Sequence, residues 1–239
     1  MRQQMFLTFT LFATLVFRGP IVFAATVSNH DEAQLQNSWL TEFLTPSSYE
    51  MHQVEDDAQL QPMAAEIIDD CRGTRLTDDD IPGGEGLNQI IAIGEKLWRL
   101  IEAGRPVVNY RAPVVHALPL ANICWTDLES WRPPVSKVWE VNYKNGFGVN
   151  VVKFRFRVVY TPGGKYEENG AYLANVTVMP AALDVAWGYT MNAETIVGRA
   201  INLGTKKNPI AGLQLLITWN VKTIVKDSTQ SETIFIRGD

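Results

Sequence analysis

Residues 136–161 read SKVWEVNYKNGFGVNVVKFRFRVVYT, two stretches of alternating polar and apolar residues around an Asn-Gly turn. Asn-Gly between alternating segments is the strongest short-range signal for a β-hairpin. One face of this hairpin is predicted to cover a core and the other to meet water. The predicted apolar face consists of Trp139, Val141, Tyr143, Val152, Phe154, Phe156, Val158 and Tyr160. The predicted polar face consists of Glu140, Asn142, Lys144, Lys153, Arg155 and Arg157.

The chain after the hairpin continues as strand-forming segments separated by Pro, Gly and Asn. Strands are predicted at residues 171–179, 183–191, 196–203, 210–225 and 233–237. Within the second of these, Leu183, Val185, Trp187, Tyr189 and Met191 are expected to point inward. Several strands with such punctuation predict a mainly β fold, an antiparallel β-sandwich.

One amphipathic helix is predicted before the hairpin, at about residues 87–103. At 100° per residue, the apolar side chains of this segment fall on one half of a helical wheel. Gly94 lies in the middle of that half, and Gly104 and Pro106 follow the segment. A glycine at this place suggests a close approach of the helix to the sheet, so that Gly94→Leu is expected to destabilise the fold by overpacking.

The first 24 residues have the features of a secretory signal peptide. Arg2 precedes an apolar run from Met5 to Phe17, and Val22-Phe23-Ala24 is a small-residue cleavage pattern. The run is too short to cross a bilayer, and no later run is long enough. The mature chain is therefore expected to lack a transmembrane segment and to be secreted or periplasmic after cleavage near Ala24.

The charge of the chain is unevenly distributed. Residues 25–86 contain 14 acidic and 2 basic side chains, and residues 87–239 contain 12 acidic and 17 basic ones. Because residues 25–62 are poor in aliphatic side chains, they are predicted to form a flexible acidic arm, apart from a short helix at 32–44. Residues 63–239 are assigned to the β-sandwich domain. The arm is expected to dock on the basic face of the hairpin.

Two cysteines, Cys71 and Cys124, are present in the whole chain. In an exported chain such an even pair predicts a disulfide bond, with two buried thiols as the alternative. Neither cysteine has a second Cys or a His at ligand spacing, so no metal site is predicted there. The acidic run at residues 78–80 lacks the ligand pattern of an EF-hand, and a solvated loop is expected.

Four segments carry a resemblance to known proteins. They are GLNQIIAIGEKLW at 86–98, GRPVVNY at 104–110, YKNGFG at 143–148, and NPIAG with TWNVKT between 208 and 223. From about residue 84 to the C-terminus the chain resembles a family of uncharacterised secreted bacterial proteins with no assigned activity. The resemblance implies export from a bacterium and no particular reaction.

Catalytic motifs are missing from the sequence. The histidines are His30, His52 and His116, and the last lies in an apolar segment where a structural role is expected. No Gly-x-Ser-x-Gly elbow is present. A pair of carboxylates acting as in glycosidases is left open, since no motif defines one. The chain is predicted not to be an enzyme and to need no cofactor.

Two surfaces are candidate binding sites. Lys153, Arg155 and Arg157 form a candidate anion-binding face that suits polyanions or membrane headgroups. Trp125 and Trp131 lie in one loop and are candidates for stacking on sugars, with packing on the disulfide as the alternative for Trp125. Nucleic acid is not an expected partner of an exported acidic chain.

The sequence thus predicts a secreted, non-catalytic binding or structural protein of the bacterial envelope or exterior. Its partner is an unnamed macromolecule or glycan. The alternative function is that of a carbohydrate-active module that binds or hydrolyses sugars. The last three residues, Arg237-Gly238-Asp239, spell an integrin-type tripeptide, which is interpreted as a plain C-terminal tail.

Overall fold

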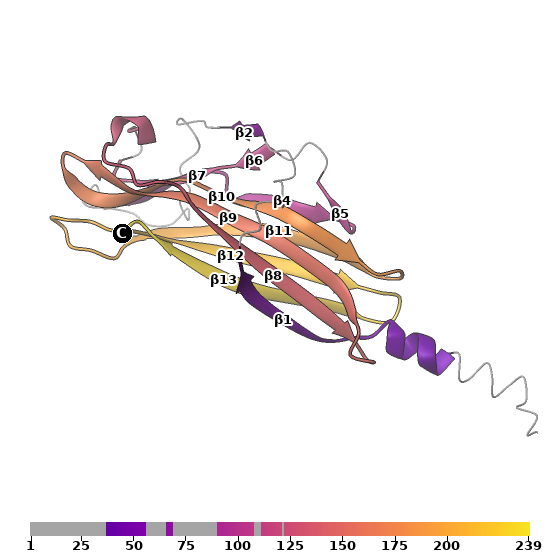
Figure 1. Cartoon of the computed structure of the whole chain (residues 1–239). Coiled ribbons are helices and arrows are strands. Elements are labelled where there is room, and N and C mark those ends of the chain that lie inside the picture. Colours follow the sequence, from indigo (N-terminus) through magenta and orange to yellow (C-terminus); the bar gives the residue numbers. More distant parts are fainter. Residues whose placement is uncertain (1–36, 56–65, 69–89, 108–110, 121) are drawn as a thin grey trace, which may run out of the picture. The chain divides into compact units, whose positions relative to one another are not determined.

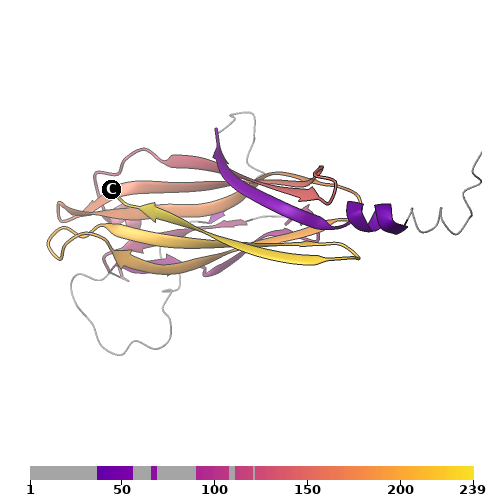
Figure 2. The same ribbon diagram turned by 90° about the horizontal axis from the view of Figure 1, so that it is seen from below.

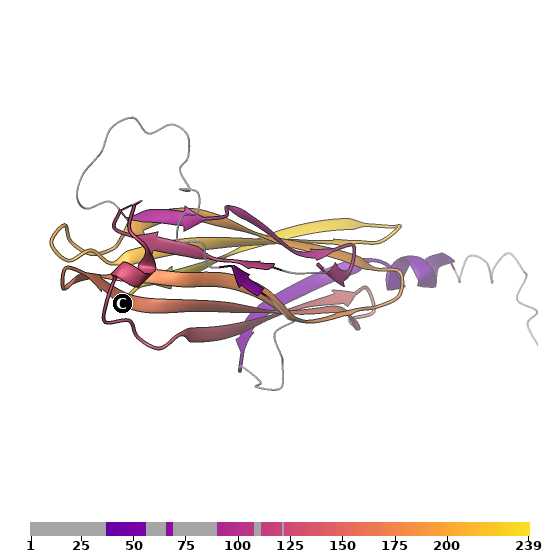
Figure 3. The ribbon, with the colours of Figure 1, turned by 90° about the horizontal axis from the view of Figure 1, so that it is seen from above.

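The computed structural model describes residues 37–55, 66–68, 90–107, 111–120 and 122–239. The chain divides into two compact units, residues 1–37 and 38–239, and every described strand belongs to the second unit. Two antiparallel sheets dominate this unit, as the sequence predicts (Figure 1). Seen from the side, they form the two layers of a sandwich (Figures 2 and 3).

The first sheet has six strands in the order β1-β8-β9-β10-β7-β3. Its strands are β1 (Pro46–Val54), β8 (Val135–Asn145), β9 (Asn150–Tyr166), β10 (Asn169–Val185), β7 (Val115–Leu118) and β3 (Ile91–Gly94). The second sheet has five strands in the order β13-β12-β11-β4-β5. Its strands are β13 (Asp227–Arg237), β12 (Ala211–Lys222), β11 (Thr190–Asn202), β4 (Leu97–Glu102) and β5 (Arg105–Pro106). A separate parallel pair joins β2 (Glu66–Ile68) to β6 (Arg111–Pro113).

The predicted hairpin is present as β8 and β9. The two strands pair antiparallel from Val135↔Tyr160 to Lys144↔Asn150. In the turn, the Asn145 side chain accepts hydrogen bonds from the backbone N–H groups of Phe147 and Val149, at 3.1 and 3.0 Å. Seven of the eight residues of the predicted apolar face are buried: Val141, Tyr143, Val152, Phe154, Phe156, Val158 and Tyr160.

The prediction of a helix at 87–103 is wrong for all the residues of this segment that the structure describes. Residues 91–94 are strand β3 of the first sheet, and residues 97–102 are strand β4 of the second. The chain passes from one sheet to the other at Glu95 and Lys96. Apolar side chains from both short strands face the same core, and this gave the sequence a helix-like spacing. The Ile-rich composition of residues 90–101 suits strands, because β-branched side chains pack well on a pleated surface.

Part of the predicted acidic arm belongs to the fold, so its assignment as flexible is wrong for the described stretch. Residues 37–43 form a short helix, inside the one predicted at 32–44. Strand β1 then pairs with β8 from Pro46↔Asn145 to Val54↔Val138. Its inward side chains Tyr49 and Met51 pack against the core. The remaining residues of the arm, 25–36 and 56–62, lie outside the described part of the chain.

The predicted strand boundaries need two corrections in β10 and β11. Pro180 does not end a strand but lies inside β10, next to a register shift between Pro180 and Ala182. Such a bulge accommodates a proline, which cannot donate a ladder hydrogen bond. Residues 186–189, predicted as strand, are the turn between β10 and β11, in which Gly188 has φ +83°. Trp187 is therefore exposed and does not point inward.

Candidate functional site

Three turns and the short helix meet at one end of the sandwich. The turns comprise residues 146–149 between β8 and β9, 186–189 between β10 and β11, and 223–226 between β12 and β13. Together with residues 38–45 they are called the loop end here. Figures 1 and 2 show these turns side by side, at the end of the sandwich opposite the C-terminus.

Backbone carbonyls at the end of the helix hold the three turns together. The carbonyls of residues 42, 43 and 44 each accept a hydrogen bond from a different turn. The donors are, in order, the N–H of Gly146 at 3.2 Å, the hydroxyl of Tyr189 and the hydroxyl of Thr223 at 2.7 Å. The last carbonyls of a helix have no partner within the helix. Here they fix the turns relative to one another.

Aromatic rings pack beside these hydrogen bonds. Trp39 stacks on Phe43, with ring centroids 5.4 Å apart, and also lies 6.2 Å from the ring of Phe147. Phe43 in turn meets Tyr189 edge to face at 6.2 Å. Because the rings come from the helix and from two of the turns, the loop end has a well-defined apolar surface.

The outer surface of the loop end is unusually apolar. Nine large apolar side chains are exposed in the described part of the chain, and six of them lie here. Trp187 is 76% exposed and Ile224 is 86% exposed, each within a different turn. The other four are Trp39, Phe147, Val149 and Val225. Turns of soluble proteins are normally polar, so a concentration of this kind makes the loop end the candidate interaction surface.

Charges around the loop end balance. Lys144, Lys222 and Lys226 flank the turns, and so do Glu42, Asp184 and Asp227. Lys226 is used internally, since its ammonium group donates to the carbonyl of Pro46 at 2.9 Å. The surface therefore offers apolar contact without a strong electrostatic preference.

The predicted anion-binding face carries its own counter-charge. Glu140, expected to be in water, is only 6% exposed. Its carboxylate accepts hydrogen bonds from Asn142 at 2.8 Å and from Arg155, and it pairs with Lys153 at 3.3 Å. Two of the three predicted anion-binding side chains are thus committed to Glu140, and Arg157 is buried.

The same contacts determine the acidity of Glu140. Burial by itself raises the pKa of this carboxyl, but the hydrogen bonds from Asn142, Arg155 and Lys153 outweigh that effect and lower the pKa from 4.5 to about 2. Because the folded-state pKa is depressed, the ion pairs stabilise the fold fully above the unfolded-state value near 4.5. This contribution is lost as the pH falls towards 2.

Replacing Glu140 is expected to remove this acid-sensitive contribution. Glu140→Gln leaves Arg155 and Lys153 without their counter-charge, which we expect to cost about 1–2 kcal/mol at pH 7 after allowance for solvent screening. The loss should shrink as the pH falls from 4.5 towards 2. Urea unfolding at several pH values measures it, with Glu50→Gln, an exposed carboxylate on the neighbouring strand, as control. Equal losses at pH 7 and pH 2.5 would contradict the assignment.

Trp125 and Trp131 are packed against the sheet. Trp125 begins the 3-10 turn η1 (Trp125–Asp127), and the two rings meet edge to face with centroids 6.3 Å apart. The indole N–H of Trp131 donates to the carbonyl of Trp125 at 3.2 Å, and its ring lies against Gly164. Both side chains are partly buried against the core. They do not form a flat, open strip, so sugar stacking on them stays a prediction.

The remaining candidate residues have separate positions. His116 is buried in β7, and its Nδ1 accepts from the N–H of Asn175 at 3.3 Å, in keeping with a structural role. Cys124 precedes η1, but Cys71 and residues 78–80 lie outside the described ranges, so the disulfide stays a prediction. Within the described ranges, no group of three or more His, Cys, Asp or Glu side chains could hold a metal ion.

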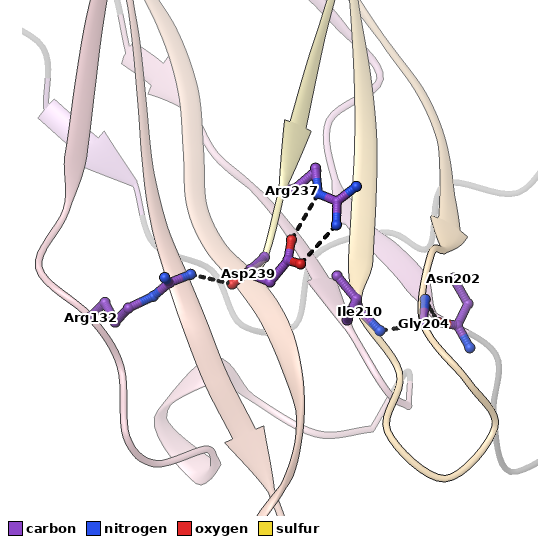
Figure 4. A network of polar contacts seen from close by, with 7 residues as sticks. Arg132, Asn202, Gly204, Ile210, Arg237 and Asp239 are labelled. Atoms are coloured by element: carbon purple, nitrogen blue, oxygen red, sulfur yellow. Dashed lines mark hydrogen bonds and ion pairs between the residues drawn. The ribbon is translucent and has the colours of Figure 1, made fainter.

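The C-terminal tripeptide is tied back to the fold at the other end of the sandwich. Arg237 donates two hydrogen bonds to Asp239, at 2.8 and 2.7 Å, and these hold the pKa of Asp239 below its usual value (Figure 4). The carbonyl of Gly238 accepts a hydrogen bond from the Arg132 side chain at 2.8 Å. The backbone N–H of Gly238 donates one to the carbonyl of Ala211, also at 2.8 Å. The tripeptide is thus a closed tail and not an open recognition loop.

No family model, curated protein or solved structure matches this chain. No helix in the described residues is long and apolar enough to cross a membrane.

Sequence reasoning missed the loop end altogether. The strand predicted at 183–191 places Trp187 in the core, and Trp39 falls within the short helix predicted at 32–44 of the flexible arm. A signal was nevertheless present in Phe147, which follows Asn145-Gly146 in a turn where a polar residue is usual. Ile224 and Val225 also stand at the very end of the strand predicted at 210–225, just before Lys226 and Asp227.

Proposed function

We propose that this chain is an exported, non-catalytic binding protein that attaches through its loop end to the interfacial layer of a lipid bilayer. Export rests on the signal-like residues 1–24 and on the predicted Cys71–Cys124 bridge. A binding role rests on the loop end, and the catalytic motifs sought in the sequence are missing.

One observation carries the proposal, namely that six of the nine exposed large apolar side chains are gathered at the loop end. Two of the six are tryptophans, the residue type that prefers the boundary between headgroups and acyl chains. The helix carbonyls hold the three turns in fixed positions, so inserting the side chains costs little ordering of the backbone.

The shape and charge of this surface favour lipid over other partners. Its most exposed side chains, Trp187 and Ile224, stand on separate turns, and a fluid layer of lipid can close around such projections. Acids and bases flank the turns in equal number, which favours neutral lipid over a polyanion. Binding should therefore depend on buried apolar area and only weakly on salt.

A vesicle-binding experiment tests the proposal. The mature chain is expected to co-sediment with phosphatidylcholine vesicles, and to do so almost equally at low and high salt. A triple variant, Phe147→Ser, Trp187→Ser and Ile224→Ser, should bind at least about tenfold more weakly, because each substitution removes apolar area from the contact.

The control replaces two exposed apolar residues elsewhere on the sandwich, Leu97→Ser and Ile201→Ser. This variant is expected to bind like the parent chain. Binding that requires anionic lipid and is abolished by salt would instead support the basic face around Lys153. Binding to neither kind of vesicle would refute the proposal.

A further inference from the structure

A second candidate site lies at the open side of the sandwich, away from the loop end. β1 ends the order of strands in the first sheet, and β13 ends it in the second. Between these two edge strands is a pocket of about 490 Å³. Its lining residues are Tyr49, Glu50, Met51, Trp139, Glu232, Thr233, Ile234 and Phe235.

Glu232 occupies an unusual position in this pocket. It lies on the same side of β13 as the buried residues Ile234 and Ile236, so its carboxylate is on the face that is turned towards the other sheet. The phenol oxygen of Tyr49 lies 3.5 Å from its Oε1. No Lys or Arg lines the pocket, whereas Glu50 adds a second acid. A carboxylate in such partly apolar surroundings gains from a nearby cation.

Aromatic rings form much of the remaining wall. Tyr49 stacks on Tyr143, with centroids 5.5 Å apart, and meets Trp219 edge to face at 5.8 Å. Tyr143 is itself held by the indole N–H of Trp219 at 3.1 Å, so the ring of Tyr49 has a fixed position. Trp139 adds a further aromatic residue to the lining, and Phe235 contributes from the outer side of β13.

We propose that this pocket binds a small organic ammonium ion with a hydrocarbon body. Aromatic faces attract such cations through their ring quadrupoles, and the Glu232 carboxylate supplies the opposite charge. Met51 and Ile234 offer apolar contact for the hydrocarbon part. A free amine and a lipid headgroup share this chemistry, and the experiment distinguishes the two sources.

Choline is the probe, and its neutral isostere 3,3-dimethylbutan-1-ol is the control ligand. The folded chain is titrated with each ligand while tryptophan fluorescence and methyl NMR shifts are recorded. Choline is expected to bind saturably and the alcohol at least about tenfold more weakly, because only choline carries the charge that Glu232 and the rings recognise. Equal binding of both ligands, or no saturable binding of choline, would overturn the proposal.

Variants locate the site. Glu232→Gln should weaken choline binding about tenfold or more, whereas Glu232→Asp and Tyr49→Phe should keep most of it. Glu129→Gln, an exposed carboxylate outside the pocket, should leave it unchanged. Far-ultraviolet circular dichroism confirms that each variant is folded. Unchanged affinity in Glu232→Gln would refute the site even if choline binds elsewhere.

A competition experiment separates the two sources of the ammonium group. If the natural ligand is a lipid headgroup, Glu232→Gln should also weaken binding to phosphatidylcholine vesicles, and free choline should compete with the vesicles. If it is a free amine, vesicle binding should be unaffected by either change. Both outcomes keep the pocket as an ammonium site.

Discussion

A chain that begins at residue 63 is expected not to fold, although the composition of residues 25–62 predicts a dispensable arm. The deletion removes β1 and with it the antiparallel ladder from Pro46↔Asn145 to Val54↔Val138. It uncovers Tyr143, which is stacked beneath Tyr49, and leaves β8 as a new edge. Loss of the partly buried side chains of Tyr49 and Met51 costs on the order of 1 kcal/mol each, before any hydrogen bond is counted.

The deletion also removes the three helix carbonyls that hold the turns of the loop end. We expect a total loss on the order of 5 kcal/mol or more, which equals the whole stability of many domains. Thermal unfolding followed by near-ultraviolet circular dichroism measures it, because that signal reports the packed aromatic rings.

The matched control is a chain that begins at residue 37, just before the helix and β1. It should keep the melting transition of the chain that begins at residue 25, since the short helix and every described strand lie within residues 37–239. A cooperative transition in the chain that begins at residue 63, within a few degrees of the longer chains, would show that β1 is not an integral strand.

Gly94→Ala is expected to destabilise the fold by about 3 kcal/mol or more. Gly94 ends β3 with φ +145°, a conformation that side chains rarely adopt. An added Cβ would lie 2.3 Å from the carbonyl oxygen of Val114 and 2.8 Å from Cγ2 of Val115. Both contacts are impossible without moving β7 away from β3, so backbone strain and overpacking act together.

Gly148→Ala separates these two effects. Gly148 also has a positive φ, +76°, but a Cβ there would meet no atom within 4 Å. Its substitution should therefore cost only the strain, about 1 kcal/mol. Urea unfolding of the two variants gives the comparison. If Gly94→Ala lowers the free energy of unfolding no more than Gly148→Ala does, β3 and β7 do not approach as closely at Gly94 as described.

The sequence predicted the structure correctly where a segment showed a single clear periodicity. Alternation around Asn145-Gly146 predicted the β8–β9 hairpin and most of its apolar face, because a two-residue periodicity cannot suit a helix. It failed at residues 87–103, where strands from two sheets lie in tandem. Neither strand is long enough to show a two-residue period of its own. The apolar residues of the two strands taken together have the spacing of an amphipathic helix. A close contact at Gly94 was predicted correctly, but it joins the neighbouring strands β3 and β7 and not a helix and a sheet.

The binding surfaces were harder to predict because they depend on how distant residues meet. Phe147, Trp187 and Ile224 are about 40 residues apart in sequence and share one end only after the sheets form. Glu140 was expected in water because it alternates with apolar neighbours, yet the side chains of Lys153 and Arg155 cover it. Such cover comes from long side chains on neighbouring strands, which alternation does not reveal.

The most direct test of the account is the depth to which Trp187 enters a bilayer. The chain is mixed with phosphatidylcholine vesicles whose acyl chains carry bromine, a short-range quencher of tryptophan fluorescence. The parent chain should be quenched with a blue-shifted emission. The double variant Trp39→Phe and Trp187→Phe, which keeps apolar side chains at both exposed tryptophan positions of the loop end, should still bind but lose most of the quenching. Unquenched emission from vesicle-bound protein, or equal quenching in the double variant, would contradict attachment through the loop end.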